Sequence, residues 1–145
     1  MVFGWAQIIM DIQPLFVLIT GDGHLHGFSH TFAGATLLAL FSAVSGKYLS
    51  EFGLKVLRIS KEPNYIIIKW RVVYISAFIG TYSHVALDAI MHSDVEPYYP
   101  LSLQNGFLEL ISVTQLHQLC MYTGFVGAVV YYAVGYVHKK YNKRV

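Results

Sequence analysis

The sequence predicts an all-α integral membrane protein with four transmembrane helices, and three observations support this fold class. The 145-residue chain is 55% hydrophobic and only 12% charged, whereas soluble proteins are about 25% charged. Its mean hydropathy is +0.50. Its apolar stretches are long enough to cross about 30 Å of hydrocarbon as helices. We expect one domain over residues 1–145, with spans at residues 2–20, 30–49, 68–91 and 112–137.

The composition also excludes several kinds of site and partner. Cys120 is the single cysteine, so the chain has no internal disulfide and no paired-cysteine zinc site. No block of basic residues alternates with aromatic residues, and we therefore expect no nucleic-acid partner. The expected partner is the lipid bilayer. Small residues along the second span permit close helix packing and a homo-oligomer.

The first predicted span carries a carboxylate near its middle. Because a charged side chain in hydrocarbon is costly, we expect Asp11 to face the bundle interior and to find a partner or a metal ion there. Pro14 lacks the amide that would bond to the carbonyl of Met10, which predicts a kink beside Asp11. A purely structural hydrogen bond to a neighbouring helix is the alternative for Asp11. The segment lacks a basic start and a small-residue cleavage site, so we expect no cleavable signal peptide.

A glycine-rich turn at residues 21–29 follows, with Ser29 as the expected N-cap of the second span. His24, His26 and His30 crowd this turn. They fit either a solvated loop or a ligand cluster, and we expect at least one of them to bind a metal.

The remaining connections are predicted from charge and turn residues. Residues 50–67 form a basic loop, with a short amphipathic surface helix at 51–59 and a turn at Pro63 and Asn64. The apolar stretch 107–137 exceeds one span, which predicts a surface or tilted helix in its first part. A basic tail, residues 138–145, ends the chain.

The candidate chemistry is concentrated between residues 82 and 100. On a helix, His84, Asp88 and His92 follow at i, i+4 and i+8 and share one face. Asp94 comes shortly after them. A single HxxxD pair is more often a structural hydrogen bond, but this longer run in an apolar setting is typical of a metal site.

The charge distribution predicts the topology. All ten Lys and Arg residues lie between the second and third spans, at the ends of those spans, or in the tail. By the positive-inside rule, both termini and the middle loop are cytoplasmic. Most histidines then lie toward the opposite side of the cell membrane, which predicts an outward-facing cup that holds them. They are His24, His26, His30, His84, His92 and His117.

Imidazole and carboxylate ligands suit Zn, Mn or Fe as a divalent ion. Such an ion with an open position activates water, which favours hydrolysis. A site at the membrane edge favours a lipid or a lipid-linked ester, phosphate esters included. We expect His92 or Asp94 to be the acid–base residue or a further ligand. The expected metal ligands are Asp11, His26, His30, His84 and Asp88.

Two motifs, HGFSHT at 26–31 and SHVALDAIMHSDVEPYYPLS at 83–102, resemble the YdjM-type membrane-bound metal-dependent hydrolases of bacteria and archaea. That family has an acidic motif in its first span, G-x-[ST]-H-[ST] at the start of the second, and SHxxxD before a proline-rich loop. The chain most resembles archaeal members, whose first motif is D-x-E-P, although Gln13 replaces the second acid here. Many bacterial members have a histidine where this chain has Leu25. The resemblance implies a metal-dependent hydrolase.

Two other functions fit the same residues. A haem-binding or electron-transfer subunit would use histidines on facing helices, such as His84 and His117, although the carboxylates beside His84 disfavour it. A transporter or structural membrane protein would use the acids and histidines as a proton or ion relay. The absence of recognisable inverted repeats disfavours a carrier.

Overall fold

The computed structural model describes residues 1–57 and 67–142. These residues form helices and connecting turns, and no strand occurs among them. Four helical segments are long and apolar enough to cross a membrane: Val2–Thr20, Phe32–Val56, Trp70–Met91 and Val113–Tyr141. This confirms the predicted all-α, multi-pass membrane fold.

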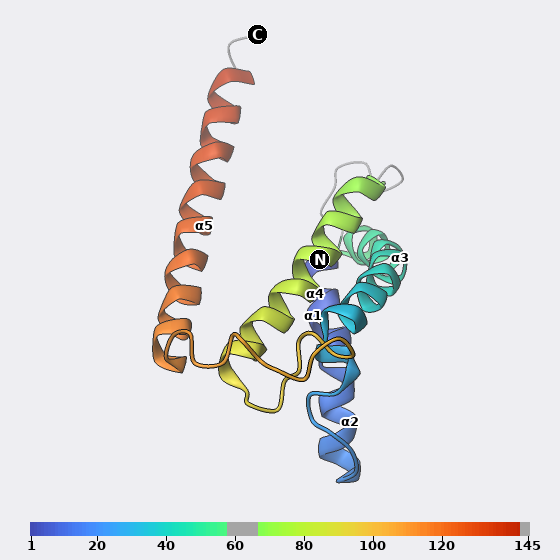
Figure 1. Ribbon diagram of the computed structural model, residues 1–145. Helices are drawn as coiled ribbons and strands as arrows, with labels where there is room; N and C mark the ends of the chain where they lie inside the picture. Colours follow the sequence, from blue (N-terminus) through green and yellow to red (C-terminus); the bar gives the residue numbers. More distant parts are fainter. Residues whose placement is uncertain (58–66, 143–145) are drawn as a thin grey trace. The chain divides into compact units, whose positions relative to one another are not determined.

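The chain divides into two compact units, Met1–Leu108 and Glu109–Val145. The second unit contains a single long helix, α5 (Val113–Asn142), and the expectation of one domain stays a prediction. The helices of the first unit are labelled in Figure 1. They are α1 (Val2–Met10), α2 (Ile12–Thr20), the 3₁₀ turn η1 (Phe28–His30), α3 (Phe32–Val56) and α4 (Trp70–Met91).

The first span is interrupted at Asp11, as the sequence predicts. Asp11 separates α1 from α2, and Pro14 in the first turn of α2 has no amide for the carbonyl of Met10. α2 ends at Gly21, whose φ of 75° lies in the left-handed region that glycine adopts without strain. The interruption leaves the carboxylate of Asp11 at a junction between two helices.

Helices α1, α3 and α4 pack together through small side chains. Ala39 and Ala43 of α3 pack against Val73 and Ala77 of α4, together with Val2 of α1. A Cβ at Gly80 of α4 would lie 3.1 Å from the carbonyl oxygen of Phe3. The backbones of α1 and α4 therefore approach closely at this glycine, which brings the end of α1 beside the second half of α4.

The start of α3 differs from the prediction. Thr31 is the N-cap, and its Oγ1 accepts a hydrogen bond of 2.9 Å from the amide of Gly34. Ser29, the predicted cap, lies inside η1 because residues 28–30 form a 3₁₀ turn before the helix begins. A Cβ at Gly34 would lie only 1.9 Å from the carbonyl oxygen of Phe28, so this turn packs directly on the first turn of α3.

The end of α3 also differs. The helix continues to Val56, so residues 50–56 belong to it and not to the predicted loop, and the separate surface helix at 51–59 is wrong for residues 51–56. Glu51 explains the extension: it pairs with Lys47 one turn earlier, and its Oε1 accepts a hydrogen bond of 2.8 Å from the amide of Ile68. The predicted turn at Pro63 and Asn64 lies outside the described residues.

The loop after α4 folds back onto the start of α3. The amide of Phe32 donates to the carbonyl of Pro97 at 2.9 Å, and the Nδ2 atom of Asn105 donates to the carbonyls of Ala89 (2.8 Å) and His92 (3.3 Å). Residues 107–111 form turns and bends, so the predicted surface helix is absent from that segment, and the alternative of a tilted helix stays a prediction. These bonds hold the segment that begins at His92 beside the turn that precedes α3.

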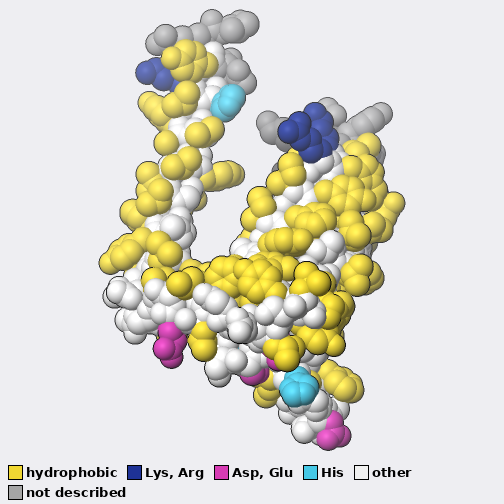
Figure 2. Space-filling view, in the orientation of Figure 1, with side chains coloured by type: hydrophobic (Ala, Val, Ile, Leu, Met, Phe, Trp, Pro, Cys, Tyr) yellow, Lys and Arg dark blue, Asp and Glu magenta, His cyan; other side chains and the backbone are white. Residues whose placement is uncertain are grey.

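The charged side chains of the first unit separate along its length. Lys and Arg lie with Glu51 at the end where α3 stops and α4 begins, and the other described Asp, Glu and His side chains of this unit lie toward the opposite end (Figure 2). The charge asymmetry of the sequence is therefore also a spatial one within this unit.

Candidate metal centre

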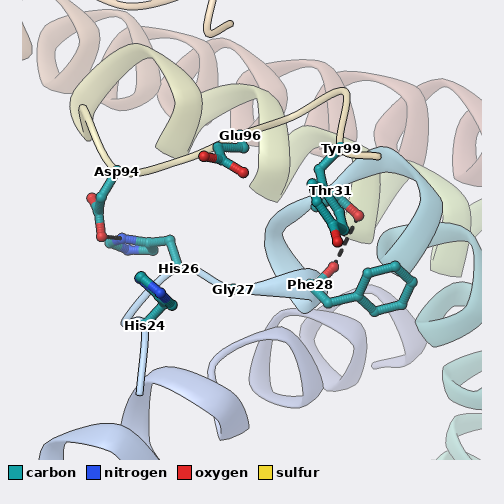
Figure 3. A pocket seen from close by; sticks show the side chains of 8 residues that line it. All are labelled: His24, His26, Gly27, Phe28, Thr31, Asp94, Glu96 and Tyr99. Carbon is teal, nitrogen blue, oxygen red and sulfur yellow. Dashed lines mark hydrogen bonds and ion pairs between the residues drawn. The ribbon is translucent and has the colours of Figure 1, made fainter. Parts of the chain in front are cut away.

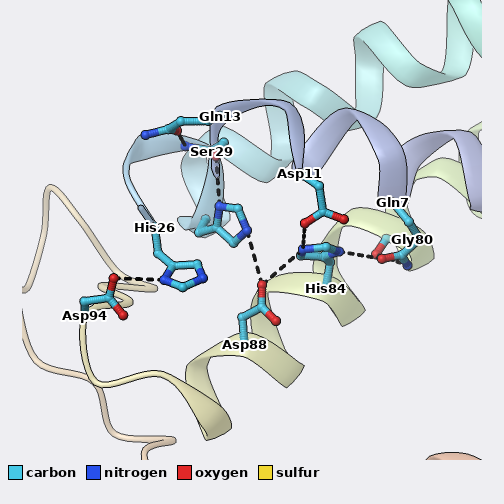
Figure 4. Close-up of polar contacts among 10 residues, drawn as sticks. Gln7, Asp11, Gln13, His26, Ser29, Gly80, His84, Asp88 and Asp94 are labelled. Carbon is cyan, nitrogen blue, oxygen red and sulfur yellow. Dashed lines mark hydrogen bonds and ion pairs between the residues drawn. The ribbon is translucent and has the colours of Figure 1, made fainter. Parts of the chain in front are cut away.

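Four separate segments of the first unit bring the predicted site residues together (Figure 4). The junction between α1 and α2 carries Asp11, the turn before α3 carries two histidines, α4 carries a histidine and an aspartate, and the loop after α4 carries one of each. Among the described residues, three groups have donor atoms within 4.8 Å of one another: Asp11, His30 and His84; His26, His30 and Asp88; and His26, His92 and Asp94.

Asp88 lies between two imidazoles. Its Oδ2 atom is 3.0 Å from Nε2 of His84, one turn earlier on α4, and 3.2 Å from Nε2 of His30. Nε2 of His84 is also 3.2 Å from Oδ1 of Asp11. These contacts form a continuous chain from Asp11 through His84 and Asp88 to His30. The helical spacing predicted the His84–Asp88 pair, and the packing of α1 and α3 against α4 supplies the other two residues.

Gln7 determines which nitrogen of His84 carries a proton. Its Oε1 atom lies 2.6 Å from Nδ1 of His84, while its amide nitrogen donates to the carbonyl of Gly80 at 3.1 Å. Because the amide nitrogen faces a carbonyl, Oε1 must accept, and Nδ1 of His84 must donate. A neutral His84 then presents the lone pair of Nε2 to Asp11 and Asp88. Two carboxylates facing a lone pair need a cation between them, either a proton on Nε2 or a metal ion.

The sequence contains a signal for Gln7 that was missed. Gln7 lies four residues before Asp11 and therefore on the same face of the first span. Apart from Asp11, it is the only strongly polar side chain between Met1 and Ile12.

His30 contributes an unsatisfied nitrogen. Its side chain is completely buried, and Nδ1 lies 2.9 Å from Oγ of Ser29. Nε2 has no well-formed hydrogen bond and lies 3.2 Å from Oδ2 of Asp88. An unsatisfied buried polar atom costs about 1–3 kcal/mol. Coordination of a metal ion by Nε2 would remove that cost.

The second cluster is built around His26. Its Nδ1 atom lies 2.9 Å from Oδ2 of Asp94, and its ring stacks on the ring of His92 with a centroid separation of 4.4 Å. Partial burial raises the pKa of Asp94, but the hydrogen bond from His26 lowers it further, and the net effect is a pKa below the usual value. Asp94 is therefore a carboxylate at neutral pH, suited to binding a cation or accepting a proton rather than to donating one.

A cavity of about 380 Å³ adjoins this second cluster (Figure 3). His26 and Asp94 both line it, so the cluster is accessible from the cavity. Two aromatic residues and a second carboxylate complete the wall, and no Lys or Arg contributes to it. The lining residues are His24, His26, Gly27, Phe28, Thr31, Asp94, Glu96 and Tyr99.

Gln13 supports the site without belonging to a donor group. Its Oε1 accepts a hydrogen bond of 3.1 Å from the amide of Ser29, and its Nε2 donates to the carbonyl of His24 at 3.4 Å. A Cβ at Gly27 would lie 1.9 Å from that Nε2 atom. Gln13 thus anchors the turn that carries His26 and His30, and Gly27 leaves room for it.

Two further histidines lie outside the three donor groups. The backbone of His24 accepts the bond from Gln13, and its side chain lines the cavity. His117 belongs to the second unit, where its Nδ1 atom lies 2.7 Å from the carbonyl of Val113 in the same helix.

The donor set fits a divalent metal ion. Ligand atoms about 2.1 Å from an ion lie about 3.0 Å apart in octahedral and about 3.4 Å apart in tetrahedral coordination. The three successive contacts of Asp11 with His84, His84 with Asp88 and Asp88 with His30, at 3.0 to 3.2 Å, match these separations. No family model, curated protein or solved structure matches the chain. The function is therefore inferred from the chemistry of these residues.

Proposed function

We propose that this chain is a membrane-bound metal-dependent hydrolase whose metal ion is held by Asp11, His30, His84 and Asp88. The observation that carries the proposal is the state of His84. Gln7 holds a proton of the imidazole on Nδ1, so Nε2 of the neutral ring offers a lone pair to the space shared with two carboxylates. The unsatisfied Nε2 atom of His30 points to the same ion. The resemblance to the YdjM-type hydrolases supports it as well.

The metal ion and the residues around it would have separate roles in hydrolysis. A divalent ion in this position supplies Lewis acidity and lowers the pKa of a coordinated water. Gln7 and Ser29 orient the imidazoles of His84 and His30 through the ring nitrogens on the other side. The ionised Asp94, which lines the cavity, would either accept a proton from water as a general base or serve as a further metal ligand.

The charge asymmetry supports an extracytoplasmic site in the cell membrane. The described Lys and Arg residues of the first unit lie at one of its ends, and the His/Asp cluster lies toward the other (Figure 2). Under the positive-inside rule, both termini face the cytoplasm and the cluster faces outward at the level of the lipid headgroups. We propose a lipid or a lipid-linked ester as the substrate, with phosphate esters included.

A proton or ion relay is the second candidate. The continuous chain from Asp11 through His84 and Asp88 to His30 favours it, because alternating carboxylates and imidazoles conduct protons. In that case Nε2 of His84 carries a proton and the ring is an imidazolium between two carboxylates. Haem ligation is less favoured, since both nitrogens of His84 are engaged in polar contacts.

Elemental analysis of detergent-purified protein tests the proposal. We expect at least one equivalent of Zn, Mn or Fe per chain, and we expect His84→Ala and Asp88→Asn each to lose one equivalent. His24→Ala is the matched control, because it removes a neighbouring imidazole that belongs to none of the three donor groups. Folded wild-type protein without metal, even after incubation with these ions, would leave the relay as the better explanation.

A further inference from the structure

The seven donor residues form three groups of three, and two of these groups, Asp11/His30/His84 and His26/His92/Asp94, share no residue. Asp11, His30, His84 and Asp88 are linked by contacts of 3.0 to 3.2 Å. His26, His92 and Asp94 form a separate group whose donor atoms lie within 4.8 Å of one another. His26 also belongs to a group with His30 and Asp88. A neutral imidazole has one lone pair, however, so His26 can coordinate an ion in only one of the two places.

We propose that His26, His92 and Asp94 bind a second divalent metal ion, which faces the cavity and is the ion that meets the substrate. This inference rests on the proposed function and deepens it. A site with three protein ligands keeps a position open for water or substrate. The three-ligand group includes His26 and Asp94, which line the cavity of about 380 Å³.

The contacts within the second group support the assignment. Nδ1 of His26 lies 2.9 Å from Oδ2 of Asp94, the separation of neighbouring ligands around one ion. The rings of His26 and His92 stack with a centroid separation of 4.4 Å and an interplanar angle of 26°, so the two imidazoles lie face to face. Asn105 and Pro97 tie the loop of His92 and Asp94 to α4 and α3, and Gln13 holds the turn of His26. The three ligands are therefore held before any ion binds.

Charge balance is an independent argument for two ions. Residues 1–46 and 72–138 contain no Lys or Arg, so no such side chain from these segments neutralises the site. The two donor groups and the cavity wall carry four carboxylates, namely Asp11, Asp88, Asp94 and Glu96. Two divalent ions would balance four negative charges with every histidine neutral. With every histidine neutral, a single ion would leave two of these negative charges without a counter-charge.

The experiment measures the number of ions, not the activity. Purified full-length protein is stripped with a chelator, equilibrated with Zn²⁺, freed of excess ion by gel filtration and analysed for zinc. We expect two equivalents in the wild type, one in His92→Ala, one in Asp94→Asn and none when His84→Ala and His92→Ala are combined. His24→Ala, which changes an imidazole beside the same cavity, keeps two. Elution volume and Tm confirm that each variant is folded, and Asp94→Asn preserves the side-chain shape if His92→Ala does not fold.

The outcomes separate the two proposals. One equivalent in the wild type, unchanged in His92→Ala and Asp94→Asn, overturns the second site and leaves the first intact. A second equivalent that persists in both variants places the ion elsewhere and also overturns this inference. No zinc in the folded wild type overturns both proposals.

Discussion

Removing the amide of Gln7 tests whether this residue sets the protonation of His84. In Gln7→Leu, Nδ1 of His84 loses the acceptor 2.6 Å away, while the volume of the side chain is nearly kept. The carbonyl of Gly80 loses the amide donor but still accepts a hydrogen bond of 3.0 Å from Oγ of Ser83. The change therefore acts on the imidazole of His84 more than on the packing of α1 against α4.

The expected magnitude follows from the position of Gln7 behind a metal ligand. Removal of such a supporting hydrogen bond typically lowers metal affinity about 10- to 100-fold. This corresponds to about 1.4–2.8 kcal/mol of binding free energy. In Gln7→Leu the proton of His84 is free to move to Nε2, where it competes with the metal ion. Gln7→Glu keeps an acceptor at the same place and is expected to retain the wild-type affinity or to exceed it.

The assay is a competition titration of apo protein in detergent with Zn²⁺ and a chromophoric chelator at neutral pH. The Kd of the tighter zinc site is compared among the wild type, Gln7→Leu, Gln7→Glu and Gln104→Leu. Gln104→Leu is the matched control, because Gln104 is exposed in the loop after α4 and belongs to no donor group. A Kd for Gln7→Leu within twofold of the wild-type value would refute the reasoning about the tautomer of His84.

Three further predictions concern stability and topology. Gly34→Ala places a Cβ 1.9 Å from the carbonyl oxygen of Phe28 and should destabilise the protein by about 1–3 kcal/mol, seen as a lower Tm in detergent. Gly124→Ala, where a Cβ meets nothing within 4 Å, should cause no loss of stability. Equal Tm values in the two variants would contradict this prediction. Asn105→Ala removes two hydrogen bonds to carbonyls at the end of α4 and should cost about 1 kcal/mol or more of unfolding free energy, measured by denaturant titration; an unchanged midpoint would argue against this role. A fluorescent protein fused to the C-terminus should fluoresce and a periplasmic phosphatase fused there should be inactive, and the reverse pattern would invert the proposed topology.

The helical spacing of His84 and Asp88 was enough to predict their contact, because residues four apart lie on one face of any α-helix. The same rule failed for His92. α4 ends at Met91, and His92 takes an extended conformation with φ −118° and ψ 125°. It consequently leaves the face of His84 and stacks on His26. Helical spacing predicts which side chains share a face only as far as the helix continues. Beyond α4, the position of His92 depends on the loop that carries Asn105, whose hydrogen bonds to the end of α4 cannot be predicted from helical spacing.

Supporting residues were harder to predict than ligands. Imidazoles and carboxylates in an apolar chain can be identified as candidate ligands from residue type alone. Gln7, Gln13 and Thr31 have no such signature, and their roles depend on which backbone or ring atom faces them in the folded chain. The cap of α3 illustrates the difference, since Ser29 and Thr31 are both favoured caps by type and only the 3₁₀ turn before the helix selects Thr31.

The sequence by itself determined the membrane class, the apolar segments, the break at Asp11 and the segregation of Lys and Arg from the histidines, because all of these depend on local composition and on helical periodicity. Tertiary structure alone decided which donors share a centre. Asp11, His30 and Asp88 come from three segments far apart in the chain, and close packing at Gly80 and Gly34 brings those segments within ligand distance. Contacts of about 3 Å between distant segments depend on backbone approach, which small residues permit but do not specify.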